Sequence, residues 1–146
     1  MSEFLQQFAM GFASLDKDNL ARVAELYSAD ILFQDPLHRI HGLADLRAYY
    51  EQLYANVSEL RFDFHGYDQT EYDQVASGEG YLRWTMHYRH PRLEGGRPLQ
   101  LEGCSYLRWR DDKVYHHHDY FDAGALLYEH LPLFGALIRW LKGRLA

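Results

Sequence analysis

Asp35 ends a short apolar run, and its type and position suit proton transfer. In an extended chain Ile31, Phe33 and Asp35 share one face, which is apolar except for this carboxylate. A carboxylate among apolar side chains is costly unless it has a partner or a use, and a general base is one such use. Pro36 favours extended backbone at Asp35 and so fixes its direction. The alternative is a turn aspartate that only ends a strand.

Asp119 is the second candidate, on a strand predicted over residues 114–121. Alternation in this strand places four side chains on one face: Tyr115, His117, Asp119 and Phe121. If Phe121 faces the core, His117 and Asp119 also point inward. A carboxylate and a histidine in an apolar cavity can divide the roles of base and acid. The alternative is that Asp119 pairs with an arginine or caps a backbone group.

Nine histidines raise the question of a metal site. The consecutive histidines 116–118 lie on a predicted strand, so at most two of them face one way. A triad of His117, Asp119 and either His38 or His41 is conceivable, but no motif has the spacing of metal ligands. We expect no metal and no cofactor.

Composition limits the class of protein. The chain of 146 residues has the size of one domain, 1–146, and 16% of its residues are aromatic, which can fill a core or line a cavity. A net charge of -6 argues against a nucleic-acid partner. One cysteine excludes an internal disulfide. With no signal peptide and no long apolar run, we expect a cytoplasmic protein.

The order of the predicted elements defines a fold class. Apolar periodicity predicts helices over 2–14, 20–28 and 42–57, strands over 30–35, from 60, and over 75–90, 99–110 and 114–121, and a last helix that Asp122 caps and Pro132 interrupts. Helices followed by an antiparallel meander and a closing helix indicate an α+β domain, with the helices covering one face of a curved sheet.

Four features in this order resemble a known superfamily. They are Leu-Tyr-Ser-Ala-Asp at 26–30, Asp35-Pro36, Gly42 before the third helix, and a final strand running to Asp119 and Asp122. The chain resembles the nuclear transport factor two-like superfamily, in its SnoaL-like and ketosteroid isomerase-like branch. The resemblance implies a cone-shaped, strongly curved mixed or antiparallel sheet, with three N-terminal helices closing a cavity and one C-terminal helix. Isomerases, polyketide cyclases, epoxide hydrolases, dehydratases and non-catalytic binders share this fold, so it settles no activity.

The resemblance also assigns expectations to residues. Asp35 falls where steroid isomerases keep their general base, but Gly11 and Ser105 stand where those enzymes keep a tyrosine and an aspartate that bind the enolate oxygen. A ketosteroid isomerase is therefore not expected. Asp119 looks like the catalytic acid of SnoaL-like cyclases. We expect these side chains to line the pocket: Phe33, His38, Tyr49, Trp84, Met86, Tyr88, Ser105 and Phe121.

Two surfaces predict partners. His116 and His118 are expected on the outer sheet face with Arg83, His87 and Arg108, where members of this family form homodimers. The segment 136–145 is apolar with three cations and no acid. It either closes over the pocket mouth or a partner subunit, burying Leu137, Trp140 and Leu141, or makes a peripheral membrane contact.

Three functions are compatible with these features. The first is a cofactor-independent isomerase, cyclase or dehydratase with Asp35 as base and Asp119 or His117 as its partner, acting on a small hydrophobic substrate of polycyclic or lipid-derived type. The second is a binding protein for such a molecule, and the third is a scaffold dimer. Two acids on apolar strand faces favour the enzyme, because buried acids are costly unless used.

Overall fold

The computed structural model describes residues 2–70, 76–125 and 132–146. Within them the helices are α1 (Glu3–Ala13), η1 (Leu20–Arg22), α2 (Val23–Leu26), α3 (Leu43–Asn56), η2 (Glu94–Gly96) and α4 (Pro132–Leu145). The strands are β1 (Tyr27–Gln34), β2 (Arg39–His41), β3 (Ser58–Gln69), β4 (Gly78–Arg89), β5 (Leu99–Arg110) and β6 (Lys113–Phe121). The predicted α+β class is confirmed. The predicted start at residue 75 of the strand over 75–90 lies outside the described residues.

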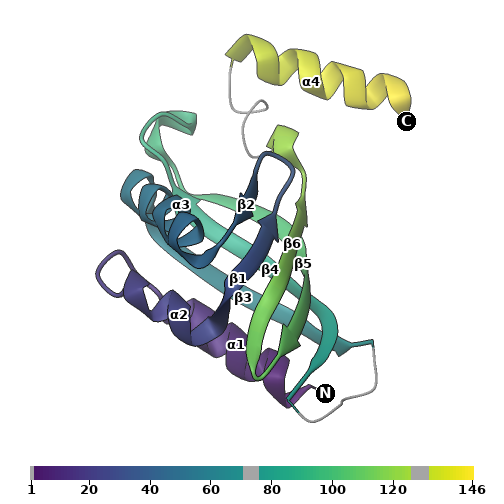
Figure 1. Ribbon diagram of the computed structural model, residues 1–146. Helices are drawn as coiled ribbons and strands as arrows, with labels where there is room; N and C mark the ends of the chain where they lie inside the picture. Colours follow the sequence, from purple (N-terminus) through teal and green to yellow (C-terminus); the bar gives the residue numbers. More distant parts are fainter. Residues whose placement is uncertain (1, 71–75, 126–131) are drawn as a thin grey trace.

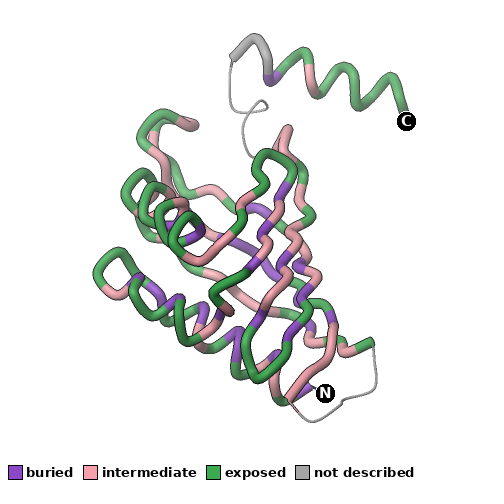
Figure 2. Tube along the Cα trace, viewed as in Figure 1, coloured by how far each residue is buried: buried purple, intermediate pink, exposed green. Residues whose placement is uncertain are grey.

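The strands form one mixed sheet in the order β2-β1-β6-β5-β4-β3. β1 and β6 are parallel, and every other pair is antiparallel. The sheet curves around a core, with α1 and α2 across one end and α3 along one side (Figure 1). Buried positions concentrate on the strands and on α1, whereas α4 is largely exposed (Figure 2). This is the expected cone-shaped fold.

Helix α1 lies across one end of the cone, and its periodicity predicted a helix here (Figure 1). Leu5, Phe8 and Phe12 recur at helical spacing, and all three are buried. Ser2 caps the helix, because its Oγ accepts the Leu5 N–H at 3.2 Å. Burial of this apolar face supplies most of the stability of such a helix.

The second predicted helix, 20–28, extends two residues too far. Helical structure ends at Leu26, and β1 begins at Tyr27, which pairs in parallel with Val114 of β6. The Tyr27 side chain is 1% exposed. Its strand conformation depends on pairing with a segment that lies far away in the sequence, so local periodicity did not reveal it. The short strand β2, which pairs with β1, was also not anticipated.

The prediction that Tyr115 shares a strand face with His117 and Asp119 is also wrong. Arg108 pairs with His116 and Trp109 with Val114, so Tyr115 is an extra residue in a β-bulge. Val114 takes the buried position, at 0% exposure, and the Tyr115 ring lies 5.5 Å from the Arg108 guanidinium. Alternation resumes after the bulge, so the bulge does not change the inward direction expected for the end of β6.

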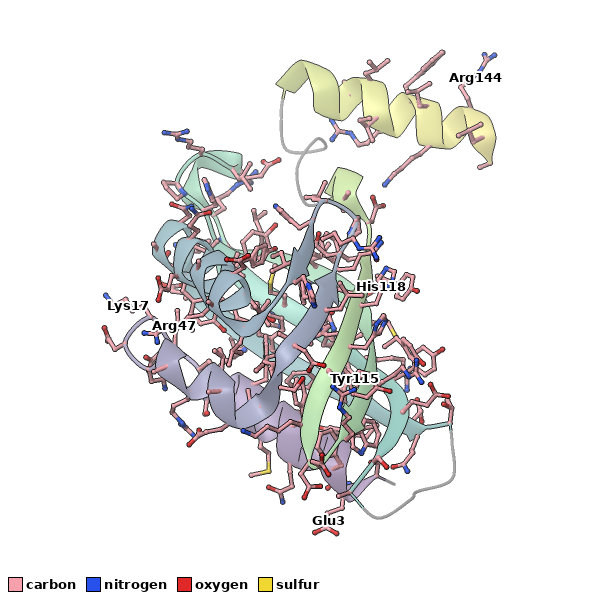
Figure 3. The ribbon with its side chains drawn as sticks, viewed as in Figure 1. Glu3, Lys17, Arg47, Tyr115, His118 and Arg144 are labelled. Atoms are coloured by element: carbon pink, nitrogen blue, oxygen red, sulfur yellow. The ribbon has the colours of Figure 1, made fainter. Side chains whose placement is uncertain are left out.

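The outer sheet face carries the polar residues predicted for it. His116, His118 and His87 are half-buried there, and Arg83 and Arg108 are exposed. Figure 3 shows Tyr115 and His118 along β6, among the side chains of this strand that do not line the core. The homodimer through this face stays a prediction.

Helix α4 stands beyond the end of β6, apart from the sheet (Figures 1 and 3). The side chains expected to be buried are exposed: Leu137 at 48%, Trp140 at 57% and Leu141 at 41%. None of the described α4 residues lines the cavity that the sheet forms with helices α1 and α3, so the predicted lid is not formed in this structure. The partner-subunit and membrane alternatives stay predictions. In the part of the chain that the structure describes, no helix combines the length and the apolar character that crossing a membrane requires.

Asp122 lies directly after β6 and contacts α4. Its Oδ1 accepts the Ala125 N–H at 3.2 Å, as expected for a helix cap, and its Oδ2 contacts the Lys142 ammonium of α4. These contacts lower the pKa of the Asp122 carboxyl, mainly through Lys142. The predicted continuation up to Pro132 falls on residues 126–131, outside the described residues.

Candidate active site

A cavity of about 580 Å³ lies between the concave face of the sheet and helices α1 and α3. Its volume is in the range of small-molecule sites. Seven of the eight side chains expected in the pocket line it: Phe33, Tyr49, Trp84, Met86, Tyr88, Ser105 and Phe121. The three candidate catalytic residues Asp35, His117 and Asp119 line it as well. The walls are mostly aromatic and aliphatic, so these polar groups are few and localised.

His38 is the exception, because it is not among the residues that line the cavity. Its side chain is 47% exposed, and its Nδ1 lies 3.1 Å from Asp35 Oδ1. It therefore contacts Asp35 from the side of the β1–β2 turn. The expectation that His38 lines the pocket is therefore wrong.

Asp35 is held by several hydrogen bonds. Its Oδ1 accepts the Leu37 N–H at 2.8 Å and the His38 N–H at 2.7 Å, which fixes the turn between β1 and β2. Its Oδ2 accepts the Tyr49 hydroxyl at 3.0 Å, and its side chain is 2% exposed. Asp35 is thus both a turn residue and a cavity residue, and both of its oxygens already have donors.

Tyr49 extends this group into the cavity from α3. Burial raises the pKa of the Tyr49 hydroxyl well above its usual value, and the negative charge of Asp35 raises it further. Tyr49 therefore keeps its proton across the physiological pH range. Its hydroxyl donates a hydrogen bond to Asp35.

Asp119 has a different environment. Its Oδ1 lies 2.5 Å from Ser105 Oγ and 2.7 Å from His117 Nε2. The indole N–H of Trp84 donates to Ser105 Oγ at 2.9 Å, and since this N–H can only donate, Ser105 uses its own hydrogen for Asp119. The Asp119 side chain is 17% exposed. Among the described residues, no hydrogen bond reaches its Oδ2.

His117 is buried at the floor of the cavity, with 3% exposure. Its Nδ1 lies 2.9 Å from the Tyr27 hydroxyl, which lies 3.1 Å from the Tyr50 hydroxyl. A carboxylate only accepts, so Nε2 carries the hydrogen that reaches Asp119, and Nδ1 of the neutral ring accepts from Tyr27. Burial raises the pKa of Tyr27 and of Tyr50 well above the usual value, so both remain donors.

These contacts form a continuous polar chain across an otherwise apolar floor. It runs from Trp84 through Ser105, Asp119 and His117 to Tyr27 and then to Tyr50. The chain directs donors at one oxygen of Asp119 and leaves the other available to a molecule in the cavity. Such an arrangement can accept or deliver a proton at a fixed position.

Sequence reasoning missed several of these residues. Tyr27 was assigned to the apolar stripe of a helix, and Tyr50 to the stripe of α3, without a polar role for either. Asn56, His90 and Arg92 also line the cavity, and no sequence signal marked them, because they lie at an element end and in a loop. In the described part of the chain, no group of three or more His, Cys, Asp or Glu side chains is arranged to hold a metal ion.

Solved structures share this fold at low sequence identity. A candidate polyketide cyclase from Pseudomonas putida KT2440 is 15% identical, with a TM-score of 0.69 over 88% of this chain and 96% of that one. A protein of unknown function with a nuclear transport factor two-like fold, from Burkholderia pseudomallei K96243, is 16% identical, with a TM-score of 0.69 over 87% and 96%. A protein with a ketosteroid isomerase-like fold from Catenulispora acidiphila, in complex with trimethylamine, is 13% identical, with a TM-score of 0.67 over 87% and 91%.

The comparison with curated proteins gave no significant match. The sequence pattern of the SnoaL-like domain, in contrast, matches residues 8–117, from α1 to the buried histidine of β6. This range contains Asp35, strands β1 to β5, the first part of β6 and most of the cavity lining, and it ends two residues before Asp119. With this match over most of its length and the nuclear transport factor two-like fold, the chain belongs to the SnoaL-like domain family.

Proposed function

We propose that the protein is an acid–base enzyme that isomerises, cyclises or dehydrates a small hydrophobic substrate in this cavity. The observation that carries the proposal is the environment of Asp119. One of its oxygens is held by Ser105 and His117, and among the described residues the other has no donor. A carboxylate that is fixed in position, faces a cavity and has a free oxygen is suited to proton transfer.

The hydrogen bonds favour Asp119 over Asp35 as the group that exchanges a proton with the substrate. Asp35 has donors on both oxygens and fixes the turn after β1. In our proposal Asp35 positions Tyr49, which is part of the cavity wall. The Tyr49 hydroxyl can turn from Asp35 to donate to a substrate oxygen. This division of roles differs from the one that the sequence suggested, in which Asp35 was the base.

His117 supports Asp119 in this proposal. Because Tyr27 holds its Nδ1, the ring keeps its Nε2 hydrogen directed at Asp119. The imidazole N–H can therefore stabilise the negative charge of the Asp119 carboxylate whenever that carboxyl group has given up its proton. Similarity in fold to a candidate polyketide cyclase adds support, but that description belongs to the relative and not to this chain.

Deuterium exchange tests the proposal without knowledge of the natural substrate. The protein would be incubated in D2O with a panel of hydrophobic cyclic ketones, and exchange at the carbon next to the carbonyl would be followed by NMR. We expect exchange above background for at least one ketone, and a loss of about 100-fold or more in Asp119→Asn, as is usual for removal of an acid–base group.

Two further variants make this test specific. Asp63→Asn, a change on the outer sheet face where Asp63 contacts His87, is the matched control and should leave exchange unchanged. Asp35→Asn should keep part of the exchange. Full exchange in Asp119→Asn, or its loss only in Asp35→Asn, would refute the assigned roles.

The non-catalytic alternative is a binding protein for a hydrophobic molecule, and the predominantly apolar cavity lining favours it. A binder needs the volume but not the chain of polar contacts to Asp119. Binding of a ligand by both the native protein and Asp119→Asn, with no exchange in either, would support the binder.

A further inference from the structure

Arg92 is the one cation with a fixed charge among the described residues that line the cavity. It belongs to the loop between β4 and β5, and its side chain is exposed. Asn56, at the end of α3, is also exposed and lines the cavity, whereas Ser105 and His117 are buried. The exposed residues mark the mouth and the buried ones the floor. Arg92 therefore stands at the mouth, whereas Ser105 and His117 of the polar chain lie at the floor.

Most arginines of this protein are already paired with an acid. The ion pairs are Arg22–Glu25, Arg47–Glu51, Arg61–Asp63, Arg83–Asp68, Arg89–Glu59, Arg97–Glu94, Arg108–Glu79 and Arg110–Asp30. Among the described residues, no acid lies within ion-pair distance of the Arg92 guanidinium. Within the described strands β1 to β6 and their loops, one other arginine has no acid within ion-pair distance. This is Arg39 on β2, which does not line the cavity.

His90 adds a second polar group beside Arg92. The backbone N–H of Arg92 donates to His90 Nδ1 at 3.1 Å, so in the neutral ring the hydrogen is on Nε2. His90 also lines the cavity and is half-buried. The mouth thus offers a guanidinium fork and an imidazole N–H within three residues of one loop. Guanidinium binds carboxylates through two parallel hydrogen bonds.

We infer that Arg92 and His90 form a subsite for a carboxylate, and that the substrate is an amphipathic acid. This inference rests on the proposed function, because it assigns the substrate class of the same cavity. Asp35 and Asp119 repel an anion from the interior, and the apolar walls cannot solvate one. The carboxylate therefore stays at the mouth beside Arg92. The apolar body enters the cavity and presents its reacting carbon to Asp119.

The test compares an acid with its neutral ester, which has the same apolar body. The uncharged dye N-phenyl-1-naphthylamine would report occupancy of the cavity, and decanoate and methyl decanoate would displace it. We expect the native protein to bind decanoate more tightly than the ester. Arg92→Gln should lower the affinity for decanoate about fivefold, which is the upper end for an exposed ion pair, and should change the affinity for the ester by less than twofold.

Arg39→Gln is the matched control, since it removes an exposed arginine outside the cavity and should leave both affinities unchanged. Raising the salt concentration should lower the affinity for decanoate and not the affinity for the ester. Equal affinity of acid and ester, or no effect of Arg92→Gln, would overturn the carboxylate subsite and leave the proposed enzyme standing. Failure of both compounds to displace the dye would overturn the subsite. If only the deuterium-exchange test fails, the proposed enzymatic function is refuted but the preference for an acid is not.

Discussion

Ser105→Ala tests the polar chain beneath the cavity. Ser105 is 5% exposed and connects two groups: it accepts the Trp84 indole N–H at 2.9 Å and donates to Asp119 at 2.5 Å. The alanine leaves the buried N–H of Trp84 without an acceptor and removes one of the two donors to Asp119. An unpaired buried donor costs about 1–3 kcal/mol. Because Asp119 keeps His117, we expect a total loss of about 2–3 kcal/mol in the free energy of unfolding.

A double-mutant cycle isolates the contact between Trp84 and Ser105. Trp84→Phe removes the indole N–H, so no donor is left unpaired when Ser105 is then replaced. We expect Ser105→Ala to cost about 1–2 kcal/mol less in the Trp84→Phe background than in the native protein. Urea unfolding followed by far-UV circular dichroism measures all four proteins, since fluorescence would change with the loss of Trp84.

The outcome of the cycle bears directly on the site. A coupling below about 0.5 kcal/mol is what independent positions give, and it would refute the hydrogen bond between these two side chains. The orientation of Ser105 toward Asp119 would then lose its physical basis. In the exchange assay, Ser105→Ala should also lower the rate, because Asp119 is then held by His117 alone.

Two more predictions concern packing and pH. A Cβ at position 103 would overlap the Trp84 ring, so Gly103→Ala should lower the free energy of unfolding by about 1–3 kcal/mol. Gly143→Ala is the control, because a Cβ there meets nothing within 4 Å, and equal results for the two variants would refute the close packing of Gly103 against Trp84. Burial, and then the charge of Arg108, lower the pKa of His116 below its usual 6.5. Just below pH 6.5 the folded state therefore binds fewer protons than the unfolded state, so the stability of the protein falls on acidification through this range. In urea unfolding between about pH 5 and pH 7, His116→Gln should therefore lose less stability on acidification than the native protein. An unchanged dependence of stability on pH would contradict the half-buried position of this ring.

Local sequence patterns were sufficient to predict the features that depend on neighbouring residues. Alternation placed Ile31, Phe33 and Asp35 on one face, and all three are buried. Helical spacing located α1 and α3 closely, and period-two patterns located the long strands of the sheet. These features follow from local periodicity, because burial of one face requires the same spacing whatever the partner is.

Features that depend on which distant segments meet could be read only from the folded structure. Tyr27 became a strand residue through pairing with β6, and a bulge in the β5–β6 register turned Tyr115 outward. Register also placed Ser105 opposite Asp119, which no local pattern specifies. Arg92 reached the cavity mouth from a loop, where side-chain direction has no period to follow. Cross-strand register and loop course are set by the packing of the whole chain, and so the contacts that define the site emerge only in the folded protein.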